Sequence, residues 1–77
     1  MTKIYMIGDL ARHTKFSLDT LNYYLRIGLI EEIGRSERNN YRYFDESTVK
    51  ELNKIEKLRL DKVPIKEILR RRKDGVL

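Results

Sequence analysis

The segment Ser17-Leu18-Asp19-Thr20-Leu21-Asn22-Tyr23-Tyr24 decides how this chain folds. On a helix, it separates into two faces of different chemistry. One face is an apolar stripe with helical spacing, made of Leu18, Leu21, Tyr24 and Leu25. The opposite face carries Asp19, Asn22, Tyr23 and Arg26. An amide, a phenol and a guanidinium in one row are suited to base edges and phosphates, so the pattern predicts the recognition helix of a helix-turn-helix.

The residues on either side of this segment predict where the helix begins and ends. Ser17 is a good N-cap, because its hydroxyl can accept a hydrogen bond from an unpaired backbone N–H. Gly28 is placed to end the helix in the left-handed conformation. Upstream, apolar residues with helical spacing predict a first helix from about Ile7 to His13, and Thr14–Phe16 is short enough to be a turn.

A β-hairpin is expected after the second helix. Leu29–Ile33 reads as a short extended segment, and the polar stretch Arg35–Asn40 ends in an asparagine pair suited to a left-handed turn. Tyr41–Phe44 is rich in aromatic residues and typical of a strand. Met1–Tyr5 is consistent with either a short strand or an ordered arm. The hairpin is the "wing" of a winged helix.

Two further helices complete the expected fold. Asp45 is the expected N-cap of the third helix, whose buried stripe is Val49, Leu52, Ile55 and Leu58. Pro64 fixes φ at the start of a fourth helix, whose inward residues are Ile65, Ile68 and Leu69. We therefore expect a mainly α, winged helix-turn-helix domain over residues 1–77, with about four helices and a short β-hairpin.

Composition limits the possible functions. The 77 residues contain no cysteine and one histidine, and the net charge is +5. These counts argue against disulfides and a metal site, and since no Gly-rich phosphate loop stands out either, we expect no bound cofactor. No pair of residues suited to nucleophilic or acid–base catalysis stands out, so we expect a protein that is not an enzyme. No apolar run has membrane-spanning length, which predicts a cytoplasmic protein without a membrane partner. The positive charge favours a polyanion such as nucleic acid.

The motifs in this order resemble one known family. Ile7–Ala11, Ser17–Tyr24, Gly28-Leu29, Tyr41–Phe44 and the segment from Leu58 to Ile68 resemble the N-terminal DNA-binding domain of the MerR family of bacterial transcriptional regulators. The resemblance covers almost the whole chain. It implies sequence-specific binding to double-stranded DNA in the bacterial nucleoid, with the second helix in the major groove and the wing on the backbone.

The resemblance also suggests roles for individual residues. Tyr23 and Tyr24 match the paired tyrosines of the family, although Tyr24 also completes the apolar stripe. Arg42 matches the wing arginine that holds the DNA backbone, and Arg59 matches a basic position that touches phosphate. Including residues placed by the pattern itself, the expected DNA-binding residues are Lys15, Ser17, Leu18, Asp19, Asn22, Tyr23, Tyr24, Arg26, Arg38, Tyr41, Arg42 and Arg59.

The chain departs from the family pattern at three positions. Asn22 replaces an arginine, which removes a cation but leaves an amide that can either contact phosphate or pair with adenine. Leu25 replaces an acidic residue. Lys15 replaces a glycine, so it must either adopt a positive φ or lie in a different turn.

Other partners and functions remain open at this stage. Full-length members form homodimers through a C-terminal helix that would follow Leu77, and they act on RNA polymerase indirectly at a promoter. An excisionase-like or architectural DNA-bending factor is the alternative within the same fold. A winged helix that binds protein is a third possibility, favoured by Asn22 and Leu25.

Overall fold

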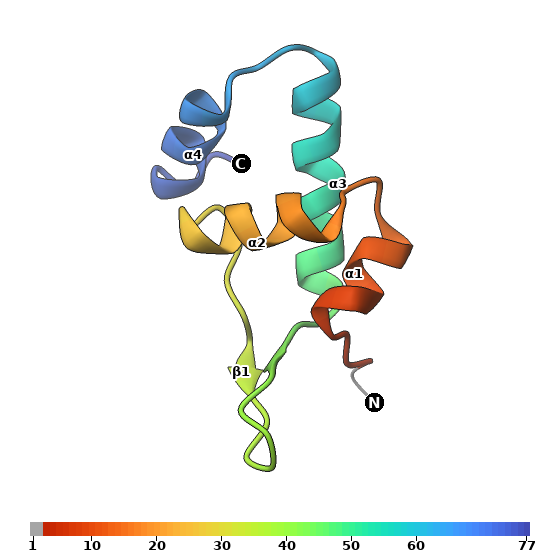
Figure 1. Cartoon of the computed structure of the whole chain (residues 1–77). Helices are drawn as coiled ribbons and strands as arrows, with labels where there is room; N and C mark the ends of the chain where they lie inside the picture. Colours follow the sequence, from red (N-terminus) through yellow and green to blue (C-terminus); the bar gives the residue numbers. More distant parts are fainter. Residues whose placement is uncertain (1–2) are drawn as a thin grey trace.

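The computed structural model describes residues 3–77 as four helices and a small hairpin (Figure 1). The helices are α1 (Ile7–His13), α2 (Leu18–Arg26), α3 (Glu46–Leu60) and α4 (Ile65–Lys73), and the strands are β1 (Gly34–Arg35) and β2 (Arg42–Tyr43). The expected mainly α, winged helix-turn-helix fold is therefore confirmed. None of the helices in this described range is long and apolar enough to cross a membrane.

Helices α1 and α2 form the expected helix-turn-helix pair. The N–H of Thr20 donates to Ser17 Oγ over 3.2 Å, which confirms Ser17 as the N-cap of α2. Gly28 has φ +78°, and this left-handed residue ends the helix as predicted. Lys15 is not among the non-glycine residues with positive φ, so the turn between the helices uses ordinary backbone conformations.

The wing is shorter than the sequence suggested, and it begins later. The segment Leu29–Ile33, expected to be extended, bends at Leu29, Ile30 and Ile33, and only the N–H of Ile33 pairs with the facing strand, at the carbonyl of Tyr43 over 2.9 Å, before β1 starts at Gly34. The strands are antiparallel, with Gly34 opposite Tyr43. The chain reverses at a turn in which Asn40 has φ 60°, as its place in the asparagine pair predicted.

A β-bridge between Tyr5 and Phe44 attaches the wing to the segment that precedes α1. The N–H of Tyr5 donates to the carbonyl of Phe44 over 2.8 Å, and the N–H of Phe44 donates to the carbonyl of Tyr5 over 2.7 Å. The strand or arm expected at the N-terminus is therefore paired with the wing at Tyr5. Residues 1 and 2 of that segment lie outside the described part of the chain. The bridge brings the beginning of α1 beside the root of the wing.

Helices α3 and α4 pack against the same hydrophobic core as α1 and α2. The N–H of Ser47 donates to Asp45 Oδ1 over 2.9 Å, which caps α3 as expected. Along the predicted stripe of α3, Leu52 and Ile55 are buried, whereas Val49 and Leu58 are half-buried. In α4, Ile68 is buried, while Ile65 and Leu69 are half-buried and pack against the core.

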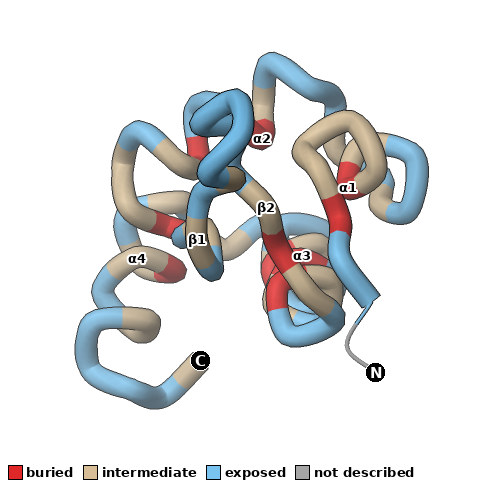
Figure 2. The backbone as a smooth tube through the Cα atoms, turned by 90° about the horizontal axis from the view of Figure 1, so that it is seen from below, coloured by how far each residue is buried: buried red, intermediate tan, exposed pale blue. Residues whose placement is uncertain are grey.

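One hydrophobic core joins these elements (Figure 2). It consists of Tyr5, Leu10, Leu21, Tyr24, Leu29, Ile30, Phe44, Leu52, Ile55 and Ile68. Every helix contributes at least one side chain to this core. Leu18 is an exception to the predicted stripe: it is 46% exposed, because it lies in the first turn of α2, beyond the edge of the core.

Candidate nucleic-acid interface

The polar face of α2 is turned to solvent. Asp19, Asn22, Tyr23 and Arg26 are all exposed, as their spacing predicted. The Arg26 guanidinium lies over the Tyr23 ring, 5.6 Å from its centroid, so these two side chains order one another through a cation–π contact. Leu18 joins this surface, because its exposed position places it beside the polar row rather than beneath it.

The wing adds two cations to the same region. Arg35 and Arg42 are cross-strand partners, and partners in an antiparallel pair point to the same side of the hairpin. Both guanidinium groups are about half exposed. Glu32 lies between them: its Oε1 is 3.3 Å from Arg35 Nε and its Oε2 is 3.6 Å from Arg42 Nε.

The environment of Glu32 keeps its carboxylate charged. Its own backbone N–H lowers the pKa of Glu32 below its ordinary value, and the guanidinium groups of Arg35 and Arg42 lower this pKa further. Glu32 therefore carries its negative charge at neutral pH and below. The charged centre at the root of the wing is a carboxylate shared by two arginines.

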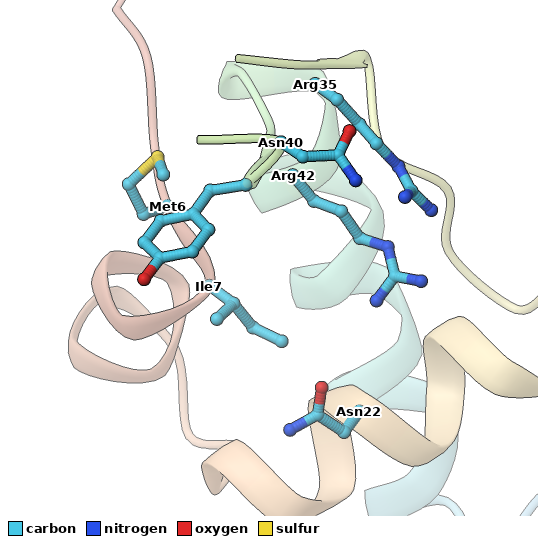
Figure 3. A pocket seen from close by; sticks show the side chains of 7 residues that line it. Met6, Ile7, Asn22, Arg35, Asn40 and Arg42 are labelled. Atoms are coloured by element: carbon cyan, nitrogen blue, oxygen red, sulfur yellow. The ribbon is translucent and has the colours of Figure 1, made fainter. Parts of the chain in front are cut away.

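A groove of about 620 Å³ connects the wing to α2 (Figure 3). Its lining residues are Met6, Ile7, Asn22, Arg35, Asn40, Tyr41 and Arg42. Figure 3 shows the guanidinium groups of Arg35 and Arg42 extending in the same direction, on the side of the wing above the helix that carries Asn22. The groove thus combines cations from one element with an amide from another.

Tyr24 and Arg59 form a second cluster outside the groove. The ring of Tyr24 is buried and meets Phe16 edge to face, with 5.3 Å between ring centroids. Burial raises the pKa of the Tyr24 hydroxyl, and the charge of nearby Arg59 acts in the opposite direction. Arg59 itself is exposed and donates from Nη1 to the carbonyl of Val63 over 3.2 Å. Tyr24 is thus part of the hydrophobic core, as its place in the apolar stripe predicted.

The other predicted residues lie along the edges of this surface. Lys15 is exposed in the turn before α2. The Ser17 hydroxyl is engaged as the helix cap. Arg38 is exposed at the tip of the wing, where its N–H donates to Ser36 Oγ over 3.3 Å. Of the residues predicted to bind DNA, the groove brings together Asn22, Tyr41 and Arg42.

Four residues of the groove were not among those predicted to bind DNA. Met6 was given no role, Ile7 was read as the start of a helix and Asn40 as a turn residue, and for Arg35 a DNA contact and a solvent-exposed charge at the tip of the wing were both left open. The pairing of Arg35 with Arg42 required the hairpin register. The alternation of residues around Arg42 was the signal that could have pointed to Arg35, since facing strands place their side chains in pairs.

The departure at Leu25 has a structural explanation. Leu25 is half-buried and packs against the core. The leucine that stands here in place of an acidic residue therefore extends the hydrophobic core and does not form an exposed apolar patch. One of the two reasons for considering a protein-binding winged helix is thereby removed.

Comparison with known proteins agrees with this geometry. Residues 5–73 match the family model described as MerR HTH family regulatory protein. The chain is also 38% identical over 71 residues to the transcriptional regulator BrlR of Pseudomonas aeruginosa, an alignment that covers 92% of this chain and 26% of that protein. The chain therefore spans about a quarter of the length of the curated relative that it matches. The family match includes α1, α2, the wing, α3 and α4, and so the chain belongs to the MerR HTH family of regulatory proteins.

Proposed function

We propose that this chain is the sequence-specific DNA-binding domain of a transcriptional regulator. In this proposal, α2 enters the major groove and the wing lies on the phosphate backbone. The observation that carries the proposal is the groove that is lined by Asn22 of α2 together with Arg35 and Arg42 of the wing (Figure 3). A duplex presents base edges and phosphates at neighbouring positions, and this surface offers an amide and two guanidinium groups at neighbouring positions.

The two parts of the surface have different roles. Arginines contact phosphate whatever the sequence, so Arg42 supplies affinity. An asparagine amide pairs with the N6 and N7 atoms of adenine, so Asn22 supplies discrimination. Arg26 and Tyr23 extend the recognition surface along α2, and Lys15, Arg38 and Arg59 are proposed phosphate contacts at its edges.

Regulation is proposed to require two copies of this domain on the DNA. A single domain of this kind reads one half-site, and symmetric operators are read by dimers with half-sites spaced by helical turns of the duplex. We propose that the domain acts in a homodimer formed by a C-terminal helix, and that it influences RNA polymerase at a promoter in the cytoplasm. The match to a transcriptional regulator favours this role over the excisionase-like alternative.

Selection of duplexes from a random pool tests the proposal. The wild-type protein is expected to enrich one motif, with an affinity that falls steeply as salt concentration rises. Asn22→Ala is expected to change the preference at one or two base pairs by about 1–3 kcal/mol, while its affinity for random duplex is retained. Failure of the wild-type protein to bind any duplex at low salt would refute DNA binding, and an unchanged motif for Asn22→Ala would refute the role of the amide.

A further inference from the structure

Glu32 contacts both arginines on the wing side of the groove. Its two carboxylate oxygens lie 3.3 Å and 3.6 Å from the Nε atoms of Arg35 and Arg42. Within residues 3–77, no other acidic side chain is ion-paired with either arginine. Two cations directly opposite one another on a hairpin repel, and a carboxylate placed between them offsets that repulsion.

A backbone phosphate has the same chemistry as this carboxylate. Both present two anionic oxygens to guanidinium N–H groups, and arginine binds either one with parallel hydrogen bonds. Glu32 meets each guanidinium at its Nε atom, so a phosphate that binds the same arginine in the forked manner, through Nε and one Nη, competes with the carboxylate for Nε. Arg35 and Arg42 are also about half exposed, which leaves the pairs with Glu32 weak enough to be exchanged.

We propose that Glu32 holds, in the free protein, the position on Arg35 and Arg42 that a DNA phosphate takes in the complex. Glu32 is thus a positioning residue that orients both guanidinium groups, and at the same time an internal competitor that lowers the affinity for any duplex. This inference rests on the proposed DNA-binding function and adds to it a mechanism that limits affinity.

The competing effect of Glu32 outweighs its orienting effect. An exposed ion pair contributes little, so losing the orientation that it provides has a small cost. The carboxylate stays within several ångströms of a phosphate held by the same arginines, and two like charges at that distance repel even in high dielectric. Removing the charge while keeping an acceptor at the same place should therefore strengthen binding.

Two variants that change the net charge equally test this proposal. Glu32→Gln removes the carboxylate from the wing but retains an amide oxygen for Arg35. Glu31→Gln is the matched control, because Glu31 is the preceding residue and its partner at 3.8 Å is Arg72 of α4. The probe is a fluorescein-labelled duplex of random sequence spanning about two helical turns, and the readout is fluorescence anisotropy at several salt concentrations.

The expected results separate competition from a general charge effect. At about 0.1 M salt, Glu32→Gln should bind about 3- to 10-fold more tightly than the wild type, with a steeper dependence on salt. Glu31→Gln should change the affinity less than about twofold. In an Arg35→Ala, Arg42→Ala background, the effect of Glu32→Gln should shrink to that of the control. Equal effects of the two glutamine variants, or weaker binding by Glu32→Gln, would overturn the proposal.

A measurement on the free protein tests the contact without DNA. The carboxyl pKa of Glu32, followed by NMR, should rise when Arg35 and Arg42 are both replaced by alanine. An unchanged carboxyl pKa of Glu32 in this double variant would overturn the proposal, whether or not a duplex is bound. If the wild type and all variants fail to bind duplex, the proposed function fails. If they bind but Glu32→Gln gains nothing over Glu31→Gln, only this inference fails.

Discussion

Replacing Arg42 with alanine removes one of the two guanidinium groups on the wing side of the groove. If Arg42 neutralises one phosphate, its loss should reduce the slope of log K against log salt by about 0.9. Relative to a 1 M reference, where this electrostatic contribution vanishes, the affinity should fall about 8-fold at 0.1 M salt and about 3-fold at 0.3 M. The loss should be the same for every duplex sequence, because phosphates carry no sequence information.

Anisotropy titrations with two unrelated duplexes measure this effect. Lys66→Ala provides the matched control, since it also removes one exposed cation but lies on α4, outside the groove. Arg42→Lys should recover most of the salt slope because it keeps the charge, but it cannot restore the forked hydrogen bonds of the guanidinium. A loss for Arg42→Ala that is independent of salt, restricted to one duplex, or matched by Lys66→Ala would refute the assignment.

Three further predictions concern the scaffold. Lys62 has φ 63°, a left-handed conformation that a side chain disfavours and glycine adopts freely. Lys62→Gly should therefore raise the free energy of unfolding, measured by urea denaturation, by up to about 1 kcal/mol. An unchanged or lower free energy of unfolding would contradict this. A Cβ at Gly34 would lie 2.5 Å from the Tyr43 hydroxyl oxygen, so Gly34→Ala should displace that ring, visible as changed Tyr43 ring-proton shifts; unchanged shifts would argue against the close contact. Hydrogen bonds from Arg70 and the following arginine lower the pKa of Glu67 to about 2. Because this pKa is depressed in the folded state, the ionised Glu67 carboxylate stabilises the fold fully above pH 4.5, and this contribution is lost as pH falls toward 2. In thermal melting, Glu67→Gln should therefore lose less stability over that pH range than the wild type.

Local sequence signals predicted much of the scaffold. The cap at Ser17, the end of α2 at Gly28 and the left-handed Asn40 all depend on chemistry within a few residues, and each was confirmed. Leu18 does not belong to the buried stripe in which its spacing placed it, because helical spacing does not show where the core ends; its exposure is consistent with its other expected place, among the residues that face DNA. The strand of the wing starts later than the extended segment expected from Leu29, because strand pairing depends on the facing residues Arg42 and Tyr43 and not on the local sequence alone.

The groove could be predicted only in part. Asn22 and Arg42 were identified from periodicity and from the family resemblance. Met6 and Ile7 enter the groove only because the Tyr5–Phe44 bridge brings the start of α1 to the wing, and no local pattern encodes that pairing. Long-range contacts therefore determined which of the predicted side chains meet.

The central claim is that α2 and the wing form one DNA-binding surface. An amide NMR titration of the whole chain with a selected duplex measures this directly, because each N–H reports on its own surroundings. The largest shifts should fall on Ser17–Arg26 and Tyr41–Tyr43, with both segments saturating at the same duplex concentration. Shifts confined to α4 and the outer side of α3, or shifts in only one of the two segments, would contradict the claim.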